Sequence, residues 1–86
     1  MNPYTETLST ENISLRTFDQ NVSEDELVWH RDREDRIVTA LQPTDWQVQL
    51  ENELPIPLTE VFIPKGLYHR VIKGTGDLHI RVNKLA

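Results

Sequence analysis

The most informative stretch of this chain is residues 63–71, with the sequence IPKGLYHRV. Val61–Ile63 predicts a short apolar strand that stops at Pro64-Lys65-Gly66, because proline and glycine typically bound strands. Leu67–Ile72 predicts the next strand, and it carries His69. The stretch therefore predicts two short strands joined by a turn, with an imidazole near the start of the second strand.

Strand signals recur at short intervals along the rest of the chain. Apolar side chains alternate with glutamines from Trp46 to Leu50, which is the period of a strand with one buried face. Gly74–Asp77 (GTGD) predicts a hairpin turn, because glycine readily takes the positive φ of tight turns. Leu54–Leu58 contains two prolines, which lack the donor of a sheet ladder, so we expect an edge or a bend there. Further strands are predicted at Ile13–Phe18, Val28–Asp32, Ile37–Leu41 and Leu78–Val82, and a turn or one short helical turn at Ser23–Glu26.

This succession of short strands predicts an all-β fold, a small antiparallel β-barrel or jelly roll with little helix. The length of 86 residues gives room for one hydrophobic core and thus for one domain. The first residues are polar, so we expect a flexible segment at 1–12 and a single domain at 13–86. Trp46 and Phe62 are predicted to lie in its core, since burial suits their apolar bulk. Because so small a domain buries little surface, we also expect a homodimer.

Composition narrows the expected partners. The net charge of −5 argues against a nucleic-acid partner, which usually requires a concentrated basic face. No apolar run approaches the roughly 20 residues that span a bilayer, and the first residues lack the pattern of a signal peptide, so we expect a cytoplasmic protein with no membrane partner. The absence of cysteine excludes disulfides, thiolate metal sites and thiol nucleophiles. We expect the partner to be a small-molecule ligand.

Two of the three histidines lie where a metal site could use them. His30 and Asp32 are two residues apart, and residues with this spacing in a strand project from the same face. His69 would join them if its strand folds back antiparallel against the first. Two histidines and a carboxylate leave coordination positions open, as in non-haem Fe(II) oxygenases. On spacing alone, the alternative that His30 and Asp32 are solvated turn residues stays open.

The segment from Pro64 to His69 resembles the second motif of the cupin superfamily, PxGxxH. His30-Arg31-Asp32 stands where the first cupin motif has HxH, and its HxD form is similar to that of Jumonji-type, 2-oxoglutarate-dependent cupin oxygenases. The resemblance covers roughly residues 27–83, and very short cupin-like proteins of this kind also occur in tailed phages. It implies a cupin barrel that holds a divalent metal, with Fe(II) as the expected ion, through His30, Asp32 and His69. It also implies 2-oxoglutarate as cosubstrate and a dioxygenase reaction on a small organic substrate.

The chain departs from the cupin motifs in ways that bear on catalysis. The first motif normally continues to a glutamate ligand, whereas here residues 33–36 read REDR, so a fourth ligand is absent or displaced. For a cation that would hold 2-oxoglutarate, Arg81 is a candidate, although strand alternation turns Arg81 and His79 away from the core. Arg36, Lys65 and Lys73 are further candidates, and the sequence does not select among them. Tyr68 is a further candidate for substrate contact. The alternative function is a non-catalytic cupin that serves as a binding or assembly module.

Overall fold

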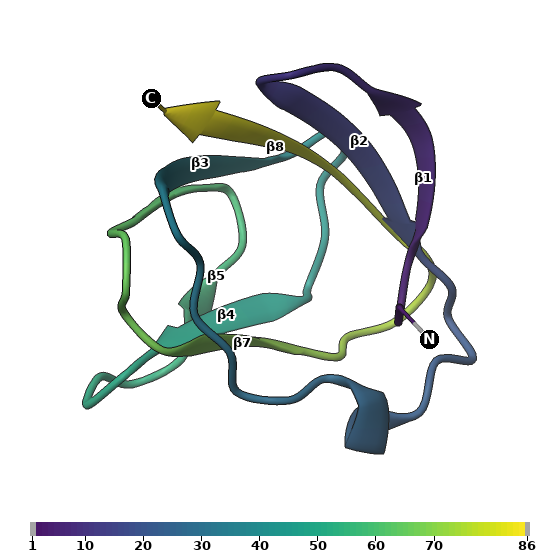
Figure 1. Cartoon of the computed structure of the whole chain (residues 1–86). Coiled ribbons are helices and arrows are strands. Elements are labelled where there is room, and N and C mark those ends of the chain that lie inside the picture. Colours follow the sequence, from purple (N-terminus) through teal and green to yellow (C-terminus); the bar gives the residue numbers. More distant parts are fainter. Residues whose placement is uncertain (1, 86) are drawn as a thin grey trace.

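The computed structural model describes residues 2–85. Met1 and Ala86, at the outer ends of the predicted flexible segment and the predicted domain, lie outside the described residues. The described part of the chain forms eight strands, all paired antiparallel, and one 3₁₀ turn, η1 (Glu24–Glu26) (Figure 1). The predicted all-β class with little helix is therefore confirmed. Within the same range, no helix has the length and apolar character needed to cross a bilayer.

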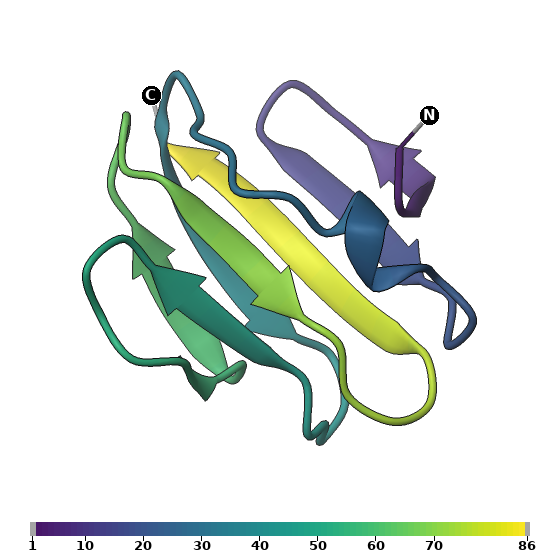
Figure 2. The ribbon, with the colours of Figure 1, turned by 90° about the horizontal axis from the view of Figure 1, so that it is seen from below.

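The larger sheet contains five strands in the order β1-β2-β8-β3-β6. Its central strand, β8 (Leu78–Leu85), pairs with β2 on one side and with β3 on the other, as Figure 2 shows. Leu78, Ile80 and Val82 are buried, whereas Arg81 between them is exposed. This period of two lets one face of the strand leave water while the other stays solvated. The remaining strands of this sheet are β1 (Thr5–Ser9), β2 (Ile13–Phe18), β3 (Asp35–Ala40) and β6 (Glu60–Ile63).

The smaller sheet contains three strands in the order β5-β4-β7 and faces the larger one (Figure 1). Its strands are β5 (Ile56–Pro57), β4 (Gln47–Leu50) and β7 (His69–Ile72). β5 is an edge strand, which confirms the position predicted for the proline-rich segment. Trp46 is fully buried, as predicted, and its indole N–H donates to the carbonyls of Thr75 and Gly76. Buried side chains of both sheets form one core, among them Val48, Leu58, Val61, Ile63, Ile80 and Val82.

The N-terminal segment differs from its prediction. Residues 1–12 were expected to be flexible, but within them β1 pairs antiparallel with β2. All five side chains of β1 are exposed, so no buried face marks this strand in the sequence. Just before β1, the ring of Tyr4 packs against Phe18 of β2 with 5.4 Å between ring centroids. The segment thus covers one end of the core instead of lying free of it.

Two further predictions are wrong. Val28–Asp32 is not a strand, and within it only His30 forms an isolated bridge, to His69 of β7. Phe62 is not a core residue, since 51% of its surface is exposed. It lies between Val61 and Ile63, which are both buried, so the pleat of β6 turns the larger side chain outward.

Candidate metal centre

Backbone hydrogen bonds hold the segment around His30 against the start of β7. His30 N–H donates to the His69 carbonyl over 3.0 Å, and His69 N–H donates back to the His30 carbonyl over 2.9 Å. Gly66 N–H donates to the Asp32 carbonyl over 2.9 Å. Gly66 has a φ of +80°, a conformation that glycine adopts without steric penalty, and this turn carries the chain from β6 into β7. The fold thus places His69 directly opposite His30, with Asp32 two residues further along.

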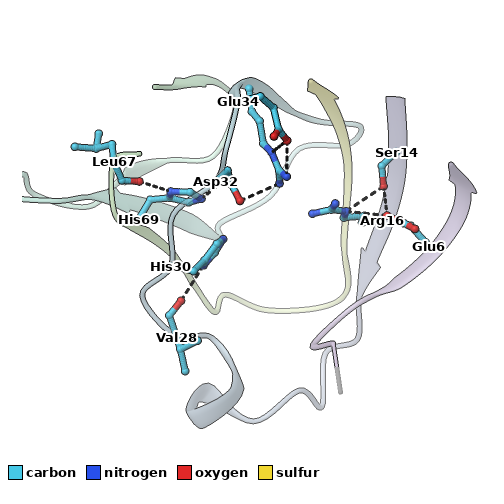
Figure 3. Close-up of polar contacts among 10 residues, drawn as sticks. Glu6, Ser14, Arg16, Val28, His30, Asp32, Glu34, Leu67 and His69 are labelled. Atoms are coloured by element: carbon cyan, nitrogen blue, oxygen red, sulfur yellow. Dashed lines mark hydrogen bonds and ion pairs between the residues drawn. The ribbon is translucent and has the colours of Figure 1, made fainter. Parts of the chain in front are cut away.

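The side chains of His30, Asp32 and His69 meet on one side of this bridge (Figure 3). One nitrogen or oxygen atom of each lies within 4.8 Å of those of the other two. Nε2 of His69 and Oδ2 of Asp32 are 3.2 Å apart. Two ligand atoms that bind one ion at about 2.1 Å are separated by roughly 3.0–3.4 Å, so these two already have the spacing of neighbouring ligands. His69 is buried and His30 is exposed, which puts His30 on the solvent side of the group.

Backbone carbonyls select the tautomer of both imidazole rings. Nδ1 of His30 lies 3.0 Å from the carbonyl oxygen of Val28, and Nδ1 of His69 lies 2.9 Å from that of Leu67 (Figure 3). A carbonyl oxygen only accepts hydrogen bonds, so Nδ1 carries the proton in each ring. In the neutral rings, Nε2 then has the free lone pair that a metal ligand requires.

Asp32 has a buried oxygen that the described residues leave unsatisfied. Its Oδ2 has no hydrogen-bond partner within residues 2–85. The nearby Nε2 of His69 cannot donate when the ring is neutral with its proton on Nδ1, so two acceptors face each other across 3.2 Å. An unsatisfied buried polar group destabilises a fold by about 1–3 kcal/mol. A cation between the two atoms would satisfy both, so the donor set fits a divalent metal ion.

Arg36 holds the carboxylate of Asp32 from the other side. Its Nη1 lies 3.3 Å from Oδ1 of Asp32, and its Nη2 and Nε contact Oε1 of Glu34 at 2.7 and 2.9 Å. Burial opposes ionisation of Asp32, but a proton on Nε2 of His69 and the positive charge of Arg36 both favour it and together hold the pKa of Asp32 below its usual value. With the neutral His69 ring described above, Arg36 is the remaining favourable contact. Asp32 is therefore an anion at neutral pH, as a metal ligand must be. Glu34 is committed to Arg36 and adds no fourth ligand to the group.

The three residues lie in the wall of a cavity of about 410 Å³. This volume falls within the range of roughly 300–1,000 Å³ that is usual for small-molecule sites. The walls are largely apolar and come from both sheets, with Phe18, Val38, Val48, Leu58, Val61, Ile63, Val71, Ile80 and Val82 among the lining residues. A small molecule in this cavity would have an apolar environment and direct access to the candidate metal ligands.

Of the three residues predicted to contact substrate or cosubstrate, the structure brings only Arg36 to the cavity. Tyr68 is exposed and lies outside the cavity, with the guanidinium carbon of Arg31 5.2 Å from the centre of its ring. Arg81 is exposed on the outer face of β8, as the alternation of that strand indicates. His79 lies on the same outer face, where its Nδ1 is 3.0 Å from Oγ1 of Thr17. Neither Tyr68 nor Arg81 is among the residues that line this cavity.

Arg16 lines the same cavity, and sequence reasoning missed it. It lies on β2 between Ser14 and Phe18, which are both buried, so these three residues share the inner face of the strand. The apolar Leu15 takes an outward position opposite Arg81 of β8. The sequence could have indicated Arg16 through Phe18. If Phe18 is buried, the residue two positions earlier in the same strand also points inward.

Comparison with models of known protein families finds no match for the sequence, and no curated protein matches it. Solved structures do match it. A cupin domain from Bordetella pertussis is 17% identical, with a TM-score of 0.62 over 100% of this chain and 98% of that one. A cupin-2 domain-containing protein from Shewanella frigidimarina is 13% identical, with a TM-score of 0.62 over 95% of this chain and 79% of that one. KdgF from a Halomonas species is 16% identical, with a TM-score of 0.60 over 96% of this chain and 80% of that one.

At these identities the likeness concerns the fold. It agrees with the two facing antiparallel sheets. The chain therefore has the fold of a small cupin, with a His–Asp–His group placed to hold a metal ion.

Proposed function

We propose that this protein is a metal-dependent cupin that acts on a small organic molecule, with His30, Asp32 and His69 as ligands of one divalent ion. The observation that carries the proposal is the pair of facing acceptors, Oδ2 of Asp32 and Nε2 of His69, which are 3.2 Å apart. A group that only stabilised the fold would be more stable with a hydrogen-bond donor at one of these two positions, since unpaired buried acceptors destabilise a fold. A bound cation gives both atoms a partner.

The reaction class that suits this donor set is that of the non-haem Fe(II) dioxygenases, with 2-oxoglutarate as the proposed cosubstrate. Two imidazoles and one carboxylate on one side of an ion leave positions open, and bound Fe(II) would supply dioxygen activation there. The residues of the chain would do the rest. Arg36 keeps Asp32 ionised and oriented, the carbonyls of Val28 and Leu67 fix the imidazole tautomers, and the apolar walls exclude water from the reacting molecule.

Zinc titration with matched histidine variants tests the metal site. Zn²⁺ is a suitable probe because it accepts nitrogen and oxygen ligands and has no redox chemistry. We expect one ion per chain for the wild type and for His79→Gln, which changes a histidine on the outer face. His30→Gln and His69→Gln should each weaken binding by at least about 100-fold, because even an outer-shell change can cost that much. His30 is exposed, so its variant should remain folded. Wild-type affinity in His30→Gln and His69→Gln would refute the assignment.

The dioxygenase step has its own test. With Fe(II), 2-oxoglutarate and ascorbate, which supplies two electrons in place of a primary substrate, the wild type should convert 2-oxoglutarate and dioxygen to succinate, CO2 and water, and His69→Gln should not. A protein that binds metal tightly but shows no turnover with any small-molecule panel would favour the non-catalytic binding role instead.

Exposed apolar side chains support a second proposal, that two copies of the chain associate. Phe62 on the edge strand β6 has 51% of its surface exposed, and Leu54, beside the edge strand β5, has 83% exposed. Light scattering after size exclusion would give twice the chain mass for the wild type. Phe62→Glu should shift the equilibrium toward the monomer if β6 forms the interface.

A further inference from the structure

We propose that Arg16 binds the anionic end of the ligand in the cavity, and that the protein therefore acts on small organic carboxylates with an apolar body. This inference rests on the proposed function, because Arg16 and the candidate metal ligands line the same cavity. It assigns a specificity role to a residue on β2, far in sequence from His30, Asp32 and His69.

The position of Arg16 on the inner face of β2 calls for a partner. Charged side chains are rarely buried unless they are paired, and only 12% of the Arg16 side chain is exposed. The inner face of a strand next to Phe18 would otherwise carry an apolar residue. Glu6 is such a partner, 3.3 Å from Nε of Arg16, so the terminal Nη end of the guanidinium is the part left among the aliphatic walls.

The described residues contact the guanidinium of Arg16 at Nε and across its flat face, so its two terminal Nη atoms remain available to a ligand. Nε donates to Oγ of Ser14 over 3.0 Å and to Oε1 of Glu6 over 3.3 Å. The ring of Tyr4 stacks against the group, with its centre 4.3 Å from the guanidinium carbon. Within residues 2–85, neither Nη atom of Arg16 makes a hydrogen bond or ion pair. Two parallel N–H donors in this fork match the two oxygens of a carboxylate.

Figure 3 shows the Arg16 guanidinium turned away from Glu6 and toward the side of the molecule where Asp32 and His69 lie. The second arginine of the cavity, Arg36, is already engaged by Asp32 and Glu34. Arg16 is thus the arginine of the cavity whose terminal donors the described residues leave for a ligand.

The described charges around the cavity cancel once a divalent ion is bound. By formal count, the lining residues Arg16, Arg36, Glu26 and Asp32 sum to zero, and the two carboxylates that pair with the arginines, Glu6 and Glu34, bring the group to about −2. A divalent ion at the candidate centre would bring it to about 0 on the same count. The carboxylate of a ligand would therefore be held by the terminal donors of Arg16 and not by an excess of positive charge, and the aliphatic walls would cover the apolar body of that ligand.

A binding comparison between hexanoate and its uncharged analogue hexanamide tests this assignment. Both probes are titrated into the wild type, Arg16→Gln, Arg16→Lys and Arg81→Gln and followed by amide chemical shifts, with the metal-free and the Zn²⁺-loaded proteins measured separately. Arg81 lies exposed on the outer face of β8, so its variant controls for the loss of one positive charge.

We expect the wild type and Arg81→Gln to prefer hexanoate over hexanamide by about ten- to hundredfold, the value of a hydrogen-bonded charge pair. Arg16→Gln should abolish this preference, and Arg16→Lys should keep part of it. Equal hexanoate affinity in wild type and Arg16→Gln would overturn the assignment, since the carboxylate would then bind elsewhere, for example at the metal. If the wild type takes up no zinc, the metal proposal fails, whereas the comparison on metal-free protein still decides the role of Arg16.

Discussion

Replacing Asp32 with asparagine should abolish metal binding while leaving the metal-free protein nearly as stable as the wild type at pH 8. Most substitutions of a half-buried charged residue destabilise a protein, so this expectation is specific to the facing acceptors of the site. In the variant, the amide of residue 32 gains N–H donors. One of them can donate to Nε2 of His69, whose proton is on Nδ1. The remaining oxygen can still accept from Arg36.

The expected magnitudes follow from these contacts. A new hydrogen bond to Nε2 of His69 contributes about 0.5–1.5 kcal/mol. Arg36 stays paired with Glu34 and can still donate to the amide oxygen of residue 32, so replacing the charge-assisted bond by a neutral one costs about 1 kcal/mol. The balance for the metal-free protein lies within about 1 kcal/mol of zero, or about 4–8 °C in Tm for a domain of this size. Zinc at about 100 times its Kd should stabilise the wild type by about 2.7 kcal/mol, which raises Tm by roughly 10–20 °C. Asp32→Asn should lose this rise.

Thermal unfolding at pH 8 with and without zinc measures all four values. A metal-free variant that is less stable than the wild type by more than about 2 kcal/mol would show that Oδ2 of Asp32 has a partner in the apo protein, contrary to the structure. A full zinc shift in the variant would show that the carboxylate is not a ligand.

Further predictions concern acid stability, the turn before β7 and the tryptophan of the core. Because the pKa of Asp32 is lower in the folded than in the unfolded chain, its ionisation stabilises the fold above about pH 4, and this contribution should be lost as the pH falls through the folded value. Urea unfolding between pH 5 and 2 should therefore show a steeper loss in the wild type than in Asp32→Asn. Gly66→Ala should lower the free energy of unfolding by about 1–2 kcal/mol, since its φ is +80°, and should weaken zinc binding because the turn positions His69. Chemical denaturation and zinc titration of this variant would check both effects, and unchanged values would contradict them. Trp46→Phe should destabilise by about 1–3 kcal/mol, because Trp46 is fully buried and the smaller ring leaves a cavity and removes the indole hydrogen bond, and an unchanged urea midpoint would contradict this.

Sequence alone predicts the parts of this fold that local pattern determines. The alternation in β4 and β8 predicts which side chains are buried, and the outward position of Arg81 follows from the same rule. The spacing of His30 and Asp32 places both on one side even though their segment is not a strand, because an isolated bridge at His30 keeps the backbone locally extended. The rule that side chains two residues apart point to the same side therefore holds here even though the predicted strand does not form.

The features that sequence reasoning missed depend on contacts between distant segments. β1 has no buried face, so only its pairing with β2 reveals it. Phe62 is outward because its short strand buries both neighbours, which apolar bulk alone does not indicate. The period of two from Phe18 could place Arg16 on the inner face of β2, but only the pairing of β2 with β8, a strand from the opposite end of the chain, brings that face to the cavity.

Binding of one divalent ion by His30, Asp32 and His69 can be observed in a crystal structure. The crystal is grown with added zinc, and the data are measured at the zinc absorption edge. We predict an anomalous peak about 2.0–2.2 Å from Nε2 of both histidines and from Oδ2 of Asp32. Density for an ion at another place on the protein, with these three side chains as they are in its absence, would contradict the account.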